Sequence, residues 1–256
     1  FRPLGIFYSI SHWNALFAPS LRGIFRQIEH TDLKTIVAFL GIALTFYFLF
    51  LAKKRRFFQQ AVSFSIITTG FAGMIFDLMI IFTFQALYGY VFSWIGILVA
   101  AFMAGAACGA SMATSAMTRM KNCFKLFVTI EVVLICFSFG FPVVFFALYT
   151  GLDTSGFVLF RTLILSVSFL SGVLTGAQFP LANELYLKNS TSISRTAGLL
   201  YASDLLGGWL GGIAGAVLLL PVLGLTGTCM TVGLLKLASF IVLVTQATHQ
   251  SLLAKE

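Results

Sequence analysis

Long apolar runs separated by short polar loops dominate the chain from residue 35 onward. Each run has about the 20 apolar residues that an α-helix needs to cross the hydrocarbon core of a bilayer. We count seven such runs, at residues 35–52, 61–86, 91–114, 123–149, 157–179, 197–220 and 225–244. The pattern predicts an all-α, polytopic integral membrane bundle of about seven transmembrane helices, in which short loops make sequence neighbours antiparallel.

The first 34 residues have a different pattern. Large apolar side chains recur at four-residue spacing, with arginines to one side, at Trp13, Phe17, Leu21 and Phe25. This spacing predicts an amphipathic helix in the membrane interface, although a linker helix packed on a soluble domain would have the same pattern. Because the chain begins with Phe1 instead of Met, we expect a further domain upstream. The predicted organisation is an interfacial or linker segment at 1–34 and a transmembrane domain at 35–256.

Composition and charge agree with a membrane protein. Hydrophobic residues make up 59% of the chain and charged residues 9%, against about 25% charged in soluble domains. The net charge of +8 does not indicate nucleic-acid binding, because the basic residues cluster at the ends of apolar runs instead of forming one stripe. The expected partners are therefore the lipid bilayer and additional protein domains or subunits, with no nucleic acid.

The basic residues also predict the topology. If successive runs alternate in direction, one face of the membrane receives Lys53, Lys54, Arg55, Arg56, Arg119, Lys121, Lys188, Arg195 and Lys255. The opposite loops, near Gly89, Asp153 and Val222, contain no Lys or Arg. The positive-inside rule makes the first face cytoplasmic. We expect a multi-pass cell-membrane protein with a cytoplasmic C-terminus, whereas the side of residues 1–34 is left open by their own arginines.

Small residues predict where helices touch. Glycines recur at small-xxx-small spacing, which lets helix backbones approach closely in lipid. They are Gly105, Gly109, Gly172, Gly176, Gly207, Gly208, Gly211, Gly212 and Gly215. This places the third, fifth and sixth helices in the predicted bundle core. The phrase FMAGAACGA at Phe102 also echoes FLSGVLTGA at Phe169, which is expected of an internal repeat or of composition alone.

Five ionisable side chains inside the apolar runs are the candidate binding residues. They are Asp77, Glu131, Arg161, Asp204 and Lys236. Charges within a membrane are costly and therefore point to function. Depth along the helices predicts that Asp77 pairs with Arg161 and that Lys236 pairs with Glu131 or Asp204, which leaves one carboxylate to bind a cation or a proton. Structural pairing that only locks the bundle is the alternative, and Glu131 has the further option of snorkelling to the interface.

Other chemistry finds no support in the sequence. The four cysteines have no C-x-x-C spacing, and all three histidines lie outside the apolar runs. No phosphate-binding glycine loop and no Ser-His-Asp set is present at a plausible depth. We therefore predict no metal, no cofactor and no catalytic residue within this chain.

Four phrases in the chain resemble a known family. They are TTGFAGMIFDLMIIF from Thr68, FMAGAACGA from Phe102, GAQFPLANELY from Gly176 and AGLLYASDLLGGWLGGIAGAVLLLPVLGLTGT from Ala197. Together they resemble the membrane portion of fused spermidine-synthase-like membrane proteins of bacteria. The resemblance implies a transporter-like helical bundle in the bacterial inner membrane, joined to a soluble aminopropyltransferase-like domain and linked to polyamines. Any aminopropyltransferase activity would reside upstream of Phe1.

Three hypotheses for function follow. The chain is a membrane anchor or assembly subunit, or it is a transporter-like bundle for a small cationic or amphipathic solute, with Asp77 and Asp204 as charge partners. The third hypothesis is an enzyme half-site that the upstream soluble domain completes. A polar cavity reaching Asp204 would favour transport, whereas solid glycine packing would favour the anchor.

Overall fold

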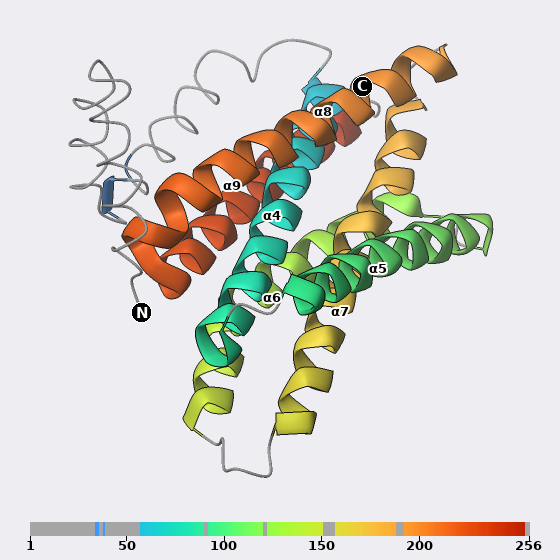
Figure 1. Cartoon of the computed structure of the whole chain (residues 1–256). Helices are drawn as coiled ribbons and strands as arrows, with labels where there is room; N and C mark the ends of the chain where they lie inside the picture. Colours follow the sequence, from blue (N-terminus) through green and yellow to red (C-terminus); the bar gives the residue numbers. More distant parts are fainter. Residues whose placement is uncertain are drawn as a thin grey trace, which may run out of the picture.

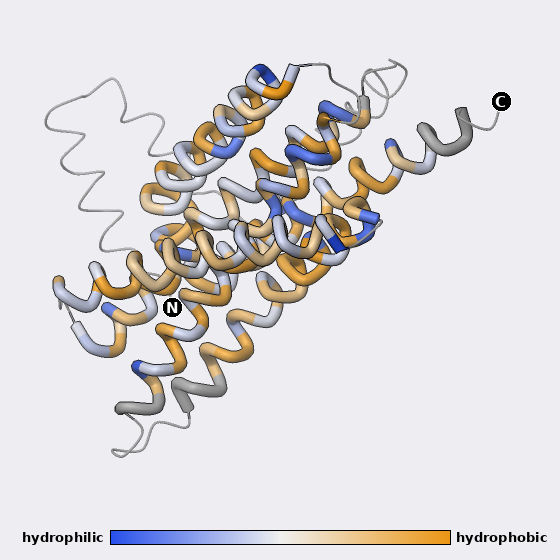
Figure 2. The backbone as a smooth tube through the Cα atoms, turned by 90° about the vertical axis from the view of Figure 1, so that its right-hand side faces the viewer, coloured by the Kyte–Doolittle hydropathy of each residue, from blue (hydrophilic) through white to orange (hydrophobic). Residues whose placement is uncertain are grey.

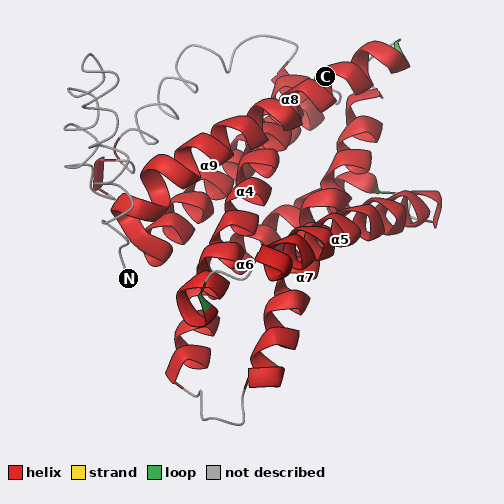
Figure 3. Cartoon of the chain, in the orientation of Figure 1, coloured by secondary structure: helices red, strands yellow, loops and turns green. Residues whose placement is uncertain are grey.

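The computed structural model describes residues 57–89, 92–119, 122–150, 157–187 and 192–253, together with the single residues 34, 35 and 38. Every regular element within these ranges is helical, and none is a strand (Figure 3). The elements are α4 (Phe57–Tyr88), α5 (Phe92–Arg119), α6 (Cys123–Thr150), α7 (Phe157–Leu187), α8 (Ile193–Ile213), the π-helical segment η3 (Ala214–Leu223) and α9 (Gly224–Leu253).

Five helical stretches are long and apolar enough to cross a membrane, namely Phe58–Tyr88, Phe92–Arg119, Cys123–Phe146, Phe160–Leu187 and Ile193–Thr248. Figure 2 shows that apolar residues cover most of their length. The predicted all-α class is thereby confirmed. The first predicted span, at 35–52, and the interfacial helix at 1–34 fall outside the described ranges except for residues 34, 35 and 38. The total of seven spans therefore stays a prediction.

The fifth stretch folds back on itself. It contains 56 residues, about twice what one crossing needs. Pro221 lies within η3 and removes a backbone donor, and Gly224 follows with a φ of +70° that favours glycine. On either side of this point the chain runs in opposite directions along α4, since Gly215 and Cys229 both lie beside the same part of that helix. η3 and Gly224 therefore form the reversal between α8 and α9.

α4 lies in the middle of the described bundle (Figure 1). Its most apolar stretch is 61% buried within the protein, against 17% for α5. The prediction that the glycine-rich third and sixth helices belong to the core is wrong, because α5 and α8 each bury only one narrow stripe, which consists mostly of small residues. A glycine stripe lets a helix approach one neighbour closely, but it does not surround the helix with neighbours.

The two echoing phrases pack directly against each other in the crossing of α5 and α7. A Cβ added at Gly105 would overlap the carbonyl oxygen of Phe169, and one at Gly172 would overlap that of Phe102. Gly109 and Gly176 repeat this relation one turn further along the same two helices. The register shows that α5 and α7 run parallel, with backbone in contact with backbone.

The contact between α4 and α8 uses only some of the glycines between Gly207 and Gly215. A Cβ at Gly207 would overlap the carbonyl oxygen of Ile67, and one at Gly211 would lie 2.6 Å from that of Phe71. By contrast, a Cβ at Gly208 would have its nearest neighbour at 3.9 Å, and one at Gly212 would meet only the flexible Met74 side chain. Gly207 and Gly211 therefore face the helix contact, whereas Gly208 and Gly212 lie beside it.

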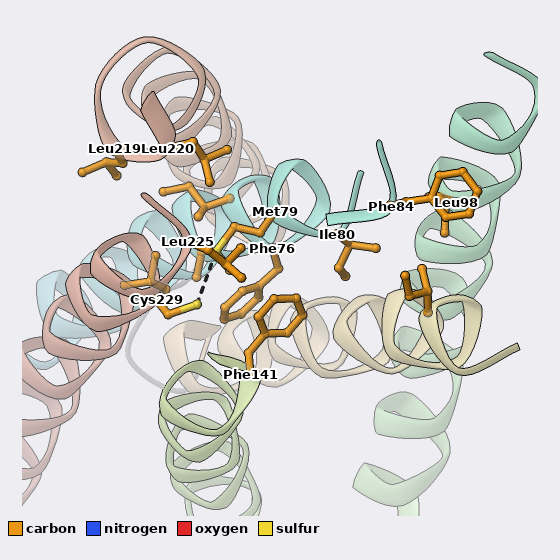
Figure 4. Packing of buried hydrophobic residues seen from close by; sticks show 14 of the residues in the cluster. Phe76, Met79, Ile80, Phe84, Leu98, Phe141, Leu219, Leu220, Leu225 and Cys229 are labelled. Atoms are coloured by element: carbon orange, nitrogen blue, oxygen red, sulfur yellow. Dashed lines mark hydrogen bonds between the residues drawn. The ribbon is translucent and has the colours of Figure 1, made fainter. Parts of the chain in front are cut away.

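An apolar core fills the space between α4, α6, η3 and α9. Figure 4 shows Phe76 and Met79 of α4 directed toward Phe141 and Cys229. The Cys229 thiol lies 3.4 Å from the Met79 sulfur, and Phe76 meets the edge of Phe137 at 5.0 Å between ring centroids. This packing fixes the helices whose other turns bring the charged residues together.

Candidate functional site

A fully buried ion pair lies where α4, α6, α7 and α9 meet. The Lys236 ammonium is 2.7 Å from Oε2 of Glu131, and both side chains have no exposed area. Of the two partners that depth allowed for Lys236, the structure selects Glu131. The idea that Glu131 snorkels to the interface is wrong, because the turn of α6 that carries it faces the inside of the bundle.

Neutral polar groups from three helices complete this pair. Lys236 also donates to Thr69 Oγ1 at 2.9 Å and to Gln178 Oε1 at 3.4 Å. The hydroxyl of Ser65 donates to Oε1 of Glu131, and that of Ser239 reaches the same oxygen at 3.4 Å. We call these six residues the polar junction. They draw on α4, α6, α7 and α9, so the junction ties four helices together.

The polar junction satisfies most of its own donors and acceptors. The ammonium has three partners, and the carboxylate has hydroxyl donors on one oxygen and the ammonium on the other. Within the described residues Nε2 of Gln178 lacks a hydrogen-bond partner. A buried pair with this many partners offsets much of its desolvation, and removal of either charge leaves the other uncompensated. The arrangement is suited to holding helices in one register.

Asp204 lies apart from the polar junction, at the contact between α4 and α8. Its carboxylate and backbone are so close to Gly70 that a Cβ there would lie 2.8 Å from Oδ1. The residue is only partly buried, and among the described residues it forms no ion pair. Only glycine at position 70 gives α8 room to bring this carboxylate against α4.

Asp77 is buried in α4, with 7% of its surface exposed. Its Oδ1 atom has no hydrogen-bond partner within the described residues. Asp77 follows Gly70 by seven residues, which places both on one face of α4 about 10 Å apart along the axis. The carboxylates of Asp77 and Asp204 therefore approach the same side of α4 at different depths.

Arg161 does not form the predicted ion pair with Asp77. Its guanidinium carbon lies 5.4 Å from the ring centroid of Tyr88 and 5.0 Å from that of Trp94. Tyr88 is eleven residues beyond Asp77 on α4, or about 16 Å along the axis. That separation is the reason for the error, because Arg161 sits at the end of α4 and is held by aromatic faces.

Sequence reasoning missed the neutral members of the polar junction. Ser65, Thr69, Gln178 and Ser239 carry no charge, and serine and threonine are common in membrane helices. Two signals pointed to them. Ser65 and Thr69 are four residues apart, so they share one helix face, and Gln178 is an amide near the end of an apolar run.

No group of three or more metal-ligating side chains occurs in the part of the chain that the structure describes. No protein-family profile, curated protein or solved structure matches the chain. The geometry of the charged residues is therefore the basis for a functional assignment.

Proposed function

We propose that this chain is a membrane domain that anchors and assembles a larger protein or complex. The observation that carries the proposal is the polar junction, in which Glu131 and Lys236 neutralise each other and tie four helices together. A closed pair of this kind leaves neither charge available to a solute. Its main effect is to hold the helices in one arrangement.

The rest of the packing supports a static role. Backbone meets backbone in the crossings of α5 with α7 and of α4 with α8, where glycines leave no space for sliding side chains. A cavity of about 190 Å³ between α4, α6 and α7 is lined by none of the five candidate ionisable residues. A polar cavity that reaches Asp204 would favour transport, but this cavity is apolar and Asp204 does not line it.

The proposed orientation follows from the directions of the helices. α4 runs parallel to α6 and α8 and antiparallel to α9, so Arg119, Lys125 and Arg195 belong to one end of the bundle. Because basic residues gather at the cytoplasmic side of a membrane, we place this end, and the C-terminus with it, in the cytoplasm. The membrane that we propose is a bacterial inner membrane. The anchored partner that we propose is an aminopropyltransferase-like domain, as the family resemblance implies.

Assembly and solute flux measured on the same preparations test the anchor. The full-length protein carrying Asp77→Asn and Asp204→Asn should keep the wild-type mass on native gels and the wild-type yield of associated subunits. Vesicles containing the wild-type protein should take up labelled spermidine no faster than protein-free vesicles. Spermidine or proton flux that requires the wild-type protein and disappears in the Asn variant would reject the anchor as the main role.

A second candidate function, binding of a cation or a proton, is favoured by the unpartnered Oδ1 of Asp77. An acid without a basic partner inside a membrane helix is a general mark of ion or proton sites. Saturable spermidine binding to the wild-type protein in nanodiscs, lost in Asp77→Asn or Asp204→Asn while the variants still assemble, would support this function. Equal binding by all three proteins would remove both carboxylates from any site.

A further inference from the structure

The cavity between α4, α6 and α7 has a shape and lining that suit a ligand. Its volume is about 190 Å³, and its lining residues are apolar except for Thr83. An apolar cavity of about 150 Å³ is enough to hold benzene in another protein. This cavity therefore accepts one six-membered ring or a short hydrocarbon chain.

The cavity reaches the surface that faces the lipid. Val144 lines it and is 46% exposed, whereas Phe141 and Ile80, which also line it, are 8% and 2% exposed. A lipid-soluble molecule can thus enter from the bilayer without crossing water. The cavity exists because Gly140 contributes no side chain, and a Cβ built there would have no neighbour within 4 Å.

Thr83 is the one polar residue in the lining of the cavity. The residue is 4% exposed, and its hydroxyl oxygen has no hydrogen-bond partner within the described residues. Rotation of χ1 by one staggered well places the hydroxyl of a threonine where its methyl group lay before. A ligand with a hydroxyl or carbonyl group would satisfy this hydroxyl, which otherwise stays unpaired at a cost in free energy.

We propose that this cavity binds a small amphipathic molecule, with a ring or a chain of about six to eight carbons and one hydroxyl or carbonyl group that contacts Thr83. The site lies apart from the polar junction and does not depend on the anchoring role. The proposed site thus gives the chain a specific lipid-soluble ligand, in addition to the lipids that surround it.

Photolabelling in nanodiscs tests the proposal with azi-octanol, an eight-carbon alcohol that carries a diazirine, and with azi-octane, which lacks the hydroxyl. Wild-type protein should incorporate azi-octanol into the cavity segments of α6 and α7, as mapped by mass spectrometry, and excess octanol should compete. Gly140→Leu fills the cavity and should reduce this labelling to the background. Gly96→Leu is the matched control, because Gly96 on α5 also has open space around its Cβ but lies outside the cavity.

The polar contact has its own test. Thr83→Val keeps the shape of the side chain but removes its hydroxyl. This substitution should weaken competition by octanol about fivefold, because one hydrogen bond contributes about that factor to the affinity. Labelling by azi-octane should stay unchanged. Thermal unfolding and elution volume identify any variant that fails to fold. Wild-type labelling in Gly140→Leu, or labelling spread evenly over α5, would overturn the site, and unchanged octanol competition in Thr83→Val would overturn the amphipathic class of ligand.

Discussion

α4 meets two acidic residues from neighbouring helices in opposite ways. Near one end it supplies the Ser65 hydroxyl to the Glu131 carboxylate and the Thr69 hydroxyl to its partner Lys236, so Glu131 is fully buried and paired. At Gly70 it supplies only space, so Asp204 lies against the backbone without a cation from the described residues. The protein therefore neutralises the charge of Glu131 internally, whereas it leaves the charge of Asp204 available to a ligand or a partner.

This difference separates stability from function. A charge that the protein neutralises contributes to holding the helices, and its loss should be seen in unfolding. A charge that the protein leaves without a partner contributes little to folding, so its retention has to be explained by a ligand, a proton or an interface.

The largest effect is expected at the polar junction. Lys236→Met leaves the Glu131 carboxylate buried without its cation, which should lower the free energy of unfolding by about 3–5 kcal/mol. Denaturant unfolding of the purified protein in mild detergent measures this change. Lys125→Met on the exposed face of α6 is the control and should stay within about 0.5 kcal/mol of wild type. Equal effects of the two substitutions would show that the ion pair does not stabilise the bundle.

The next effect separates two adjacent glycines of α8. Gly207→Ala forces a methyl group into the carbonyl of Ile67 and should destabilise by about 1–3 kcal/mol through overpacking. Gly208→Ala places the same methyl group in ordinary contact and should change stability by less than about 0.5 kcal/mol. Thermal melts of the two variants side by side check the prediction. A larger loss for Gly208→Ala would mean that α8 is rotated relative to α4.

Neutralising Asp204 should change the free energy of unfolding in the opposite direction from neutralising Glu131. Asp204→Asn removes a charge that has no cationic partner among the described residues, so the free energy of unfolding should stay the same or rise by up to about 1 kcal/mol. Glu131→Gln, measured in parallel, should destabilise because Lys236 then loses its counter-charge. A loss of stability for Asp204→Asn as great as that for Glu131→Gln would indicate a cation partner for Asp204.

The smallest effect concerns the aromatic contacts of Arg161. Arg161→Ala removes two cation–π contacts at an exposed site and should cost about 0.5–1 kcal/mol. Arg119→Ala, which removes an exposed arginine at the end of α5, serves as the comparison in the same thermal melts and should have no measurable effect. No difference between the two variants would show that the rings of Tyr88 and Trp94 do not hold Arg161.

The sequence predicted the helices well because the bilayer imposes their length. Residues 61–86, for example, fall within α4, and residues 225–244 fall within α9. Glycine spacing also predicted that Gly105 lies at a helix contact, which the structure confirms, but it did not name the segment around Phe169 as the partner. It did not identify the centre of the bundle, because close contact with one neighbour and burial among several are different properties.

The charged residues show where sequence reasoning stops. Depth along a helix limited Lys236 to Glu131 or Asp204, but depth does not give the direction in which a side chain points around the helix axis. The same limit made Asp77 and Arg161 look like partners. Aromatic residues near Arg161 were an alternative that only the packing of α4, α5 and α7 could reveal.

Two double-mutant cycles, measured as free energies of unfolding, test the central claim most directly. For Glu131→Gln with Lys236→Met, the double variant should recover about 1–3 kcal/mol relative to the sum of the single losses, because the two charges neutralise each other. For Asp77→Asn with Arg161→Ala, the losses should add within about 0.5 kcal/mol, as expected for residues that do not meet. Additive losses in the first cycle, or strong coupling in the second, would contradict the division between a paired and an unpaired carboxylate.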